Sequence, residues 1–340
     1  MNHYKPKNYL VTGGAGFIGS NFIYHLLDTY DEINIVNIDK LTYAAQLDNL
    51  TKIESSKRYT FLKVDICDQN QIENILRKNH IDTIVHFAAE SHVDRSIKTP
   101  EIFLKTNVYG TYSLLEAAKN VWLNEEKRNI SECKFHHVST DEVYGALTSE
   151  EPSFTEEFPY KPNSPYSATK ASSNHLVHAY HATYKLPISL SNCSNNYGPF
   201  QHKEKLIPTI IFNCLANKPI PIYHNGSNVR DWIYVKDHCI GLDLIIRDKN
   251  IGEKYNIGGN AELSNLTLTH LICKILSTIT HKPVDTYLSL ITFVPDRLGH
   301  DFRYSINNEK MQKKFNWRPA TNLEEGLRNT ILWYLNLNLH

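Results

Sequence analysis

The segment TGGAGFIGS, residues 12–20, stands between a short apolar run and an amphipathic stretch. The apolar run is YLVT (9–12) and the amphipathic stretch extends to about residue 30, so strand, turn and helix are predicted in that order. Gly13, Gly16 and Gly19 allow a tight turn, a close approach of the backbone to a pyrophosphate, and close packing of helix on strand. A helix N-terminus also presents free N–H groups to phosphates. The segment therefore predicts a dinucleotide-binding unit.

The rest of the first half repeats this alternation of strand and helix. We expect strands at 33–39, 59–65, 82–89 and 134–140, and helices near 70–79, near 101–120 and from Pro165 onward. Such alternation builds a parallel sheet with helices on both faces. The predicted fold class is α/β, with a Rossmann-type doubly wound parallel sheet.

The second half is less regular. It contains Pro- and Gly-rich loops, an expected strand pair around Trp232 and Tyr255, and expected helices near 266–280 and 322–336. This pattern predicts a smaller C-terminal α/β lobe over the carboxyl ends of the strands. We expect residues 1–195 to form the nucleotide-binding domain, with segments near 232–260 returning to it. Residues 196–340 would form the substrate-binding lobe.

The composition argues against several kinds of partner. Lys plus Arg equals Asp plus Glu, 36 against 36, so the net charge supports binding to neither nucleic acid nor a membrane. We find no apolar run of membrane-spanning length and no cleavable N-terminal segment, and expect a cytoplasmic protein. The six cysteines (67, 133, 193, 214, 239 and 273) lack CxxC spacing and are expected to be reduced thiols. His175, His178 and His181 have no acidic or Cys partner nearby, so they predict a solvated helix face, and no metal is expected.

Two strand ends carry acidic residues suited to a dinucleotide. Asp39 ends the second strand, 20 residues after Gly19, where a carboxylate accepts hydrogen bonds from a ribose diol and repels a 2′-phosphate. This favours NAD over NADP as the cofactor. Asp65 and Ile66 end the third strand and are expected near the adenine.

The segment PYSATK (165–170) places Tyr166 and Lys170 four residues apart at a helix start, on one helical face. A free tyrosine has a pKa of about 10, too high for a base at neutral pH. A nearby ammonium and the positive charge of an oxidised nicotinamide both favour the phenolate. In an arbitrary protein this is an ordinary helical pair, but after a glycine-rich strand–helix unit it predicts a base.

A further segment, STDEVYG (139–145), puts Asp141 and Glu142 at the end of a strand expected to be buried. The alternative is a solvated acidic turn. A dehydrogenase needs one base, whereas expelling a hydroxyl and reprotonating a carbon needs a second acid–base set. Two adjacent carboxylates supply such a set if their surroundings separate their pKa values.

Together with DKLTY, HFAAESHVDRS, NNYGP, EKLIP, RDWIYVKDH and DRLGHD, these motifs resemble the extended short-chain dehydrogenases/reductases over nearly the whole chain. More closely, they resemble the nucleotide-sugar 4,6-dehydratases that act on dTDP-glucose or UDP-glucose. The resemblance implies that Tyr166 takes the C4 hydroxyl proton while the C4 hydride passes to a retained NAD. Glu142 would then remove the C5 proton while Asp141 protonates the departing C6 hydroxyl, before the hydride returns to C6.

The resemblance also implies which residues line each subsite. The catalytic set is Thr140, Asp141, Glu142, Tyr166 and Lys170. The cofactor set adds Gly13, Gly16, Phe17, Ile18, Gly19, Asp39, Lys40, Leu41, Thr42, Asp65, Ile66, Phe87, Ala88, Ala89, Ser91, Thr106 and Asn196 to Tyr166 and Lys170. The substrate set is Ser91, Thr140, Asn195, Lys205, Leu206, Pro221, Tyr223, Arg230, Asn265, Asp296, Arg297 and His300, with Arg230 and Arg297 on the diphosphate.

Departures from the family pattern surround the expected nucleotide. Leu298 stands where the family commonly has Pro, Phe302 where Arg is frequent, and GGNAELSN (258–265) differs from the usual polar loop. Thymine and uracil differ by one methyl, worth about 1–3 kcal/mol in a fitted pocket. The choice between dTDP- and UDP-glucose is left open.

Two other functions share much of this pattern. A nucleotide-sugar 4-epimerase or decarboxylase has the same NAD lobe but needs no acid–base pair at C5 and C6. A catalytically silent NAD-binding regulatory protein should have lost one of Thr140, Tyr166 and Lys170, and all are present.

The resemblance further implies a homodimer. In relatives, the helices corresponding to those near 103–120 and 166–184 pair with their symmetry mates. Here these helices carry apolar residues on more than one face, namely Leu114, Leu115, Leu176 and Val177. Alternatively, these residues only cover the sheet.

Overall fold

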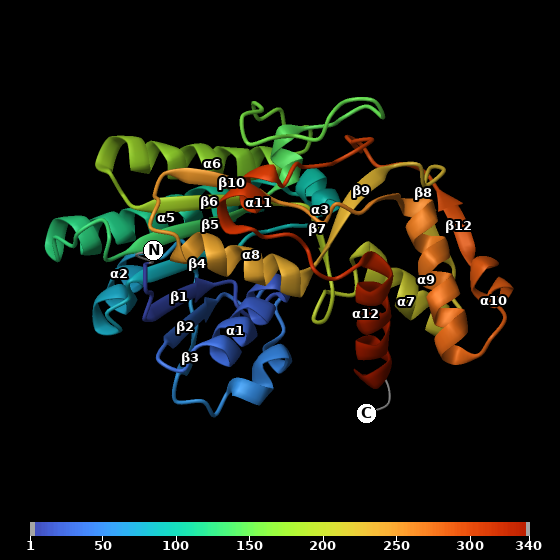
Figure 1. The fold of residues 1–340 in the computed structure, drawn as a ribbon, viewed down its shortest axis with the longest axis horizontal. Coiled ribbons are helices and arrows are strands. Elements are labelled where there is room, and N and C mark those ends of the chain that lie inside the picture. The colour runs from blue at the N-terminus through green and yellow to red at the C-terminus, as the bar shows by residue number, and fades with distance from the viewer. Residues whose placement is uncertain (1–3, 338–340) are drawn as a thin grey trace.

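The computed structural model describes residues 4–337 and is built around a seven-stranded parallel sheet (Figure 1). The strand order is β10-β6-β5-β4-β1-β2-β3. The strands are β1 (Asn8–Thr12), β2 (Asn34–Asp39), β3 (Tyr59–Lys63), β4 (Thr83–His86), β5 (Lys134–Thr140), β6 (Ile188–Cys193) and β10 (Glu253–Ile257). The order reverses between β1 and β4, and in such sheets ligands bind beyond the carboxyl ends of the strands at that point. The predicted Rossmann-type sheet is confirmed.

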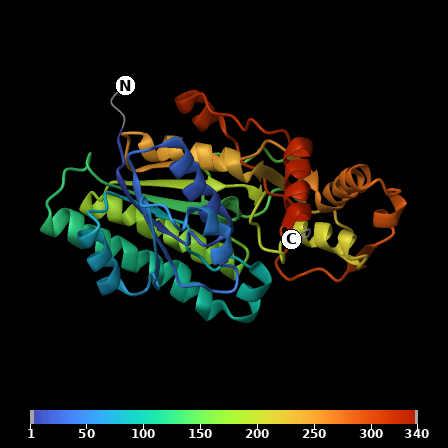
Figure 2. The ribbon, with the colours of Figure 1, turned by 90° about the horizontal axis from the view of Figure 1, so that it is seen from below.

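Helices cover both faces of this sheet (Figure 2). On one face lie α1 (Phe17–Thr29), α8 (Val235–Arg247) and α11 (Glu309–Phe315), which share a buried apolar core with β1 and β2. On the other face lie α2 (Gln69–Lys78), α5 (Gly110–Ala118) and α6 (Pro165–Tyr184). Leu114, Leu115 and Val177 are fully buried in this second core and Leu176 packs against it, so these four residues cover the sheet.

The second lobe has its own small sheets and helices. Strands β7 (Asn195–Tyr197), β9 (Val229–Tyr234) and β11 (Glu262–Ser264) form one sheet, and β8 (Ile220–Tyr223) pairs with β12 (Ile291–Val294) in another. They pack with α7 (Leu206–Leu215), α9 (Asn265–Thr280), α10 (Asp285–Leu288) and α12 (Leu323–Leu337) around a third core.

The expected pairing of strands around Trp232 and Tyr255 is wrong. Trp232 lies in β9, opposite Asn195, whereas Tyr255 lies in β10, opposite Ser191 of the large sheet. The reason is that α8 follows β9 directly and carries the chain back across the large sheet to its outer edge.

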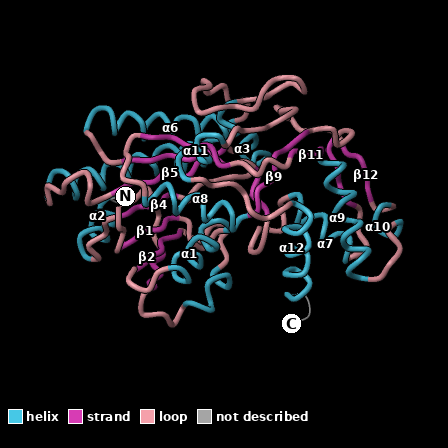
Figure 3. Tube along the Cα trace, in the orientation of Figure 1, coloured by secondary structure: helices cyan, strands magenta, loops and turns pink. Residues whose placement is uncertain are grey.

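Short helical elements and loops bring side chains to the sheet's carboxyl edge. These elements are η1 (Leu47–Ile53), α3 (Val93–Lys98), α4 (Pro100–Phe103), η2 (Leu104–Tyr109) and η4 (Asp141–Tyr144). A further element, η3 (Lys119–Glu125), lies at the opposite edge, where Trp122 donates to the Ile81 carbonyl just before β4. Both η2 and η3 are π-helical stretches continuous with α5, and π-helical turns often occur at functional sites. The largely irregular segment 145–164, which leads into α6, appears among the loops in Figure 3.

Residues 301–306 cross between the lobes. Isolated bridges join Arg303 to Leu147 and to Val229, and Ile306 to Phe154. This stretch, which we call the crossing segment, therefore lies between the 147–154 loop and β9. Within residues 4–337, no helix combines the length and apolar character needed to cross a bilayer.

Candidate active site

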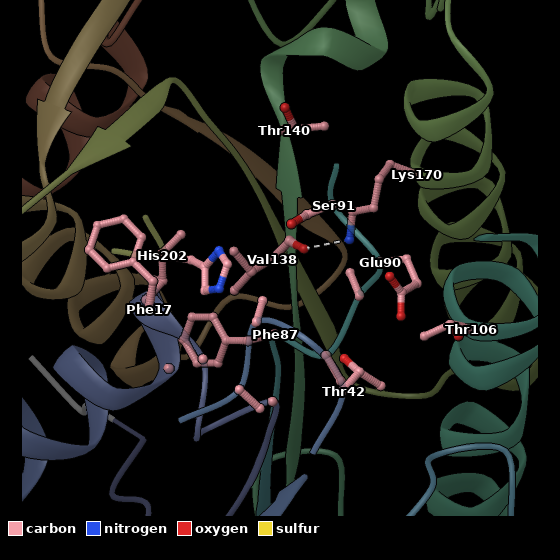
Figure 4. A pocket seen from close by; sticks show the side chains of 18 of the residues that line it. Phe17, Thr42, Phe87, Glu90, Ser91, Thr106, Val138, Thr140, Lys170 and His202 are labelled. Carbon is pink, nitrogen blue, oxygen red and sulfur yellow. Dashed lines mark hydrogen bonds between the residues drawn. The ribbon is translucent and has the colours of Figure 1, made fainter. Parts of the chain in front are cut away.

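A cleft of about 380 Å³ lies at the carboxyl ends of β1, β2, β4 and β5. It brings together all five expected catalytic residues and every expected cofactor residue except Leu41, which instead packs beside the apolar core. Of the expected substrate residues, four line it: Ser91, Thr140, Asn195 and Lys205. Figure 4 looks into this cleft, with Lys170 and Glu90 on one side and Phe17, Phe87 and His202 on the other.

The glycine turn is shaped by close backbone contacts. Gly13 has φ +72°, and a Cβ there would lie 2.6 Å from the Ala88 nitrogen, so both its conformation and its surroundings require glycine. A Cβ on Gly19 would collide with the Gly13 carbonyl oxygen. A Cβ on Gly16 would have the Gly13 oxygen as its only near neighbour, at 3.2 Å. The space beside Gly16, at the N-terminus of α1, is therefore open for a phosphate.

Asp39 is fixed by the same turn. Its carboxylate accepts hydrogen bonds from the backbone N–H groups of Ala15 (3.1 Å) and Leu41 (2.8 Å). Burial raises the pKa of Asp39, and these two bonds lower it. Lys40 is turned toward Asp65, with 2.7 Å between the Lys40 ammonium nitrogen and the carboxylate. The lone pairs left on Asp39 suit a ribose diol, as expected for NAD.

Tyr166 sits in the first turn of α6, which begins with a Ser164 capping box and Pro165. Its ring lies in an apolar cluster with Val93 and Phe103. Burial, and then the charge of Glu142, raise the pKa of Tyr166 well above its usual value, and a hydrogen bond with Thr140 lowers it. In these surroundings the phenol holds its proton, and positive charge is needed to release it.

Lys170 lies one helical turn further on and is also buried. Its ammonium donates to the Val138 carbonyl (2.9 Å; Figure 4) and lies 3.5 Å from Nε2 of His137. Burial lowers its pKa to about 8. The ammonium is thus held against β5, at the floor of the cleft.

The strand β5 ends at Thr140, whose hydroxyl caps the short helix η4. The hydroxyl accepts a hydrogen bond from the Glu142 N–H and donates one to Oδ1 of Asp141, both at 3.3 Å. Asp141 is fully buried and Glu142 is half-buried. Oδ2 of Asp141 and Oε2 of Glu142 are buried without a hydrogen-bond partner among the described residues, as expected of atoms that await a ligand.

The two carboxyl groups have different surroundings. Burial raises the pKa of Asp141 well above its usual value, and the charges of Glu142 and Asp231 add to this effect. Burial also raises the pKa of Glu142, but the cations Arg297, Arg230 and Lys205 lower it. Asp141 is therefore the better proton donor and Glu142 the better base.

Two arginines of the second lobe, Arg230 and Arg297, act on Glu142 at the Asp141–Glu142 end of the cleft. Arg230 is buried and donates to the carbonyl groups of Val229 (2.7 Å), Asp301 (3.0 Å) and Phe302 (3.3 Å). Arg297 lies 3.6 Å from Asp94, and its Nε is buried without a partner among residues 4–337. Arg297 thus keeps free donors for an anion, whereas Arg230 also holds the crossing segment.

The other expected substrate residues stand around these cations. Tyr223 donates to Asp94 (2.9 Å) across the crevice, and its ring packs edge-on against His300. His300 is held by Asp296 at 2.6 Å. Leu206 begins α7 and Pro221 lies in β8. Asn195 and Asn265 each keep a buried amide oxygen without a described partner, whereas Asn196 is bonded to Ser194 and His238.

Other residues line the cleft that the sequence analysis did not single out. Among them are Glu90, Cys193, Ser194, Gln201 and His202. Glu90 lies within the HFAAESHVDRS motif and the rest flank NNYGP, so proximity to those motifs was the available signal. Gly14 was also missed, although a Cβ there would collide with the Asn37 side chain.

The two arginines predict a contrast. Arg297→Ala is expected to raise KM for an anionic substrate about 10- to 100-fold, because a charged hydrogen bond contributes roughly 1.5–3 kcal/mol. The unfolding temperature of the Arg297→Ala variant should change little, because the ion pair that it loses, with Asp94, is partly exposed, and such a pair contributes about 0–1 kcal/mol. Arg230→Ala should lower the unfolding temperature clearly, since three carbonyl groups lose their donor. Steady-state kinetics and calorimetry check this, and equal stability losses in both variants would contradict it.

This chain resembles known proteins over nearly its whole length. The family model described as GDP-mannose 4,6 dehydratase matches residues 10–330, and the chain belongs to that family. It is 51% identical over 331 residues to the dTDP-glucose 4,6-dehydratase of Haemophilus influenzae, covering 96% of this chain and 98% of that protein. Among solved structures, the dTDP-glucose 4,6-dehydratase of Streptomyces venezuelae with NAD and TYD bound matches with TM-score 0.87 and 42% identity, over 97% of each chain. The UDP-glucose 4-epimerase of Thermotoga maritima matches with TM-score 0.84 but 26% identity, over 97% of this chain and 99% of that one.

Proposed function

We propose that this protein is an NAD-dependent nucleotide-sugar 4,6-dehydratase that converts dTDP-glucose to the 4-keto-6-deoxy sugar nucleotide. The observation that carries this is the convergence of Thr140, Asp141 and Glu142 with Tyr166 and Lys170 in one cleft. The near-full-length identity to dTDP-glucose 4,6-dehydratases supports dTDP-glucose as substrate, with UDP-glucose as the rival.

The glycine turn and the strand ends fit NAD. The open space at Gly16 would hold the pyrophosphate. Asp39 would bind the ribose diol, and Lys170 and Tyr166 would lie beside the nicotinamide. Bound there, NAD would supply a hydride acceptor for C4 of the sugar and a hydride donor for C6. A cofactor that is regenerated in each turnover has no need to leave.

The chain's own groups handle the protons. Tyr166, as phenolate, takes the proton of the C4 hydroxyl, and Thr140 hydrogen-bonds the same oxygen. Once C4 is a ketone, the C5 proton becomes acidic, and Glu142 removes it. Asp141 protonates the departing C6 hydroxyl, which leaves as water, and Glu142 then returns its proton to C5. Arg230 and Arg297 hold the substrate's diphosphate, and Lys205 lines the cleft beside the sugar.

A 4-epimerase also needs NAD and a tyrosine base. It has no use for a protonated, buried carboxyl beside a second carboxylate, because it neither removes a C5 proton nor expels a hydroxyl. The raised pKa of Asp141 therefore favours the dehydratase.

Mass spectrometry of the product tests this function. The purified protein, without added cofactor, is incubated with dTDP-glucose and UDP-glucose separately. We expect loss of one water from dTDP-glucose, faster than from UDP-glucose. Conversion to the 4-epimer, which has the same mass and is separated from the substrate by chromatography before mass spectrometry, would support an epimerase. No reaction after NAD is supplied would refute both.

We further propose a cytoplasmic homodimer, in which residues 1–195 hold NAD, β10 completes their sheet, and residues 196–340 supply the substrate lobe. The helices continuous with α5, together with α6, leave large apolar side chains exposed. Among them are Ile102, Leu104 and Tyr109, with exposed fractions of 47%, 56% and 52%. In the cytoplasm the six free cysteines stay reduced.

A pair of surface variants tests the dimer. Leu104→Glu is expected to give a monomer, because a charge buried in an apolar interface without a partner is costly. Phe293→Glu is the matched control, since Phe293 is also 56% exposed but lies in β12 of the second lobe. Light scattering after gel filtration should show twice the monomer mass for the wild type and the control. If the Leu104→Glu variant remains a dimer, the surface around Leu104 is not the dimer interface.

A further inference from the structure

The buried ammonium of Lys170 is in contact with two acceptors, and neither of them is an acid. Its Nζ donates to the Val138 carbonyl at 2.9 Å and lies 3.5 Å from Nε2 of His137. Both lysine and histidine side chains belong to buried residues. Burial disfavours the charged form of a lysine, and here it lowers the pKa of Lys170 to about 8. The charge of Lys170 near neutral pH therefore depends on these two contacts.

The contact with Lys170 also fixes the protonation of His137. An ammonium has only N–H donors, so Nε2 of His137 must accept, and the ring proton lies on Nδ1. Burial and the charge of Lys170 hold the pKa of His137 well below its usual value, so the ring is neutral. Its Nδ1 is buried without a hydrogen-bond partner among the described residues. An apolar side chain would avoid that cost, so this histidine calls for an explanation beyond packing.

The neighbouring histidine, His86, has partners on both sides of its ring. Its Nδ1 lies 2.7 Å from Oγ1 of Thr12, and its Nε2 lies 3.0 Å from Oγ1 of Thr111. The Thr111 hydroxyl donates its own proton to a backbone carbonyl one helical turn earlier, so it accepts from Nε2. The rings of His86 and His137 lie 5.1 Å apart. His86 therefore supports the ring of His137 but has no nitrogen left for Lys170.

We propose that His137 is a positioning residue that fixes the Lys170 ammonium at the floor of the cleft and keeps it charged. The inference rests on the proposed function, in which this ammonium favours the Tyr166 phenolate. With two N–H groups held by His137 and Val138, the third is left for the cleft, which Lys170 lines. Loss of the acceptor at His137 frees the ammonium to turn and favours the neutral amine.

Other titratable groups near the ammonium do not replace this acceptor. The Cys193 thiol, from β6, has a pKa raised to about 12 by burial and donates to a carbonyl group of β5. Burial, and then the charge of Lys170, hold the pKa of His86 well below its usual value. Tyr166, from the same helix, holds its proton in these surroundings, and Glu142 and Asp141 strengthen that hold.

The acidic residue on the same side of the cleft, Glu90, is also directed elsewhere (Figure 4). Burial raises its pKa, and the cations that lower it are Arg95 and Lys40. His137 is therefore the side chain that this structure provides to hold the charge of Lys170.

Three variants separate positioning from packing. His137→Met fills a similar volume without an acceptor, whereas His137→Gln reaches about as far as Nε2 and carries an amide oxygen that can accept. His136→Met is the matched control, because His136 is equally buried on the same strand but points to the opposite face. There it contacts Ser189 at 2.9 Å and Ser191 at 3.1 Å. We would measure kcat for water loss across neutral and alkaline pH, together with the unfolding temperature.

The ammonium is the active form of Lys170, so activity is lost as pH rises through its pKa. For His137→Met we expect this alkaline limb of kcat about one pH unit lower than in the wild type, with KM for the sugar nucleotide unchanged. His137→Gln should restore the wild-type limb. His136→Met should lower the unfolding temperature, since two serine hydroxyls lose their partner, but leave the limb in place.

Other results would overturn the proposal. A wild-type pH profile in His137→Met means that the ring only packs, and a lowered limb in folded His137→Gln means that an acceptor is not what matters. If His137→Met does not fold, His137→Asn replaces it, because its shorter amide ends at the depth of Nδ1 and should give the same lowered limb. Failure of the dehydratase function is distinct, because the wild type itself would then release no water from either sugar nucleotide at any pH.

Discussion

Asp141→Asn is expected to stop the reaction after sugar oxidation. Asparagine keeps the size of the side chain and can still accept from the Thr140 hydroxyl, but it has no proton to give to the departing C6 hydroxyl. A positioned general acid contributes about 10²- to 10⁴-fold to rate, so steady-state product formation should fall by that factor. Oxidation at C4 depends on Tyr166, so reduced nicotinamide should build up in its near-ultraviolet absorbance band.

Two further measurements separate this role from damage to the fold. In deuterated water, Asp141→Asn should still exchange the C5 hydrogen, because Glu142 is intact, whereas Glu142→Gln should not. The pKa of Asp141 is raised in the folded protein, so its contribution to stability is lost as pH rises above the unfolded pKa. Asparagine does not ionise in either state, so it removes this cost, and the unfolding temperature at neutral pH should equal that of the wild type or exceed it. Loss of both oxidation and stability would contradict the assignment.

Gly13→Ala is expected to destabilise the protein by about 2–5 kcal/mol, through a left-handed alanine and a forced contact with the Ala88 backbone. Gly16→Ala is the matched variant. Gly16 has φ −83°, which alanine adopts readily, and its Cβ would enter the open space. The cofactor-free form should stay within about 1 kcal/mol of the wild type, since only a helix-capping preference changes.

The difference should appear in the cofactor content. Gly16→Ala should purify with little or no NAD, because the methyl occupies the space left for the pyrophosphate. Chemical denaturation of the cofactor-free proteins gives the stability, and ultraviolet absorbance after heat release gives the NAD. Wild-type NAD content in Gly16→Ala would mean that the phosphates bind elsewhere.

Local patterns predicted the first half of the fold well. The turn between β1 and α1 depends on adjacent residues, so the glycine spacing alone located it. The strand around Tyr255 was misassigned because its partner, β6, lies far away in sequence and is reached only through α8. Likewise, apolar residues on more than one helix face indicate that Leu114 and Leu115 are buried, but not which neighbour covers them.

The site residues could be predicted because they lie in recognisable sequence motifs. The motifs do not show which charged neighbours give Asp141 and Glu142 different pKa values and so different roles. The charge of Asp231 acts on Asp141, and that of Arg297 acts on Glu142, although each lies far along the chain. The engagement of Arg230 with the carbonyl groups of residues 301 and 302 is likewise a product of the second lobe's packing.

The return of β10 to the large sheet restricts how such proteins can be recombined. A chimera that exchanges everything after residue 195 would also exchange the edge strand and α8, which pack against the recipient's own β6 and α1. A graft of substrate preference therefore needs two or more crossover points that leave 235–257 with the recipient. In this architecture, specificity is transplanted as separate inserts and not as a terminal module.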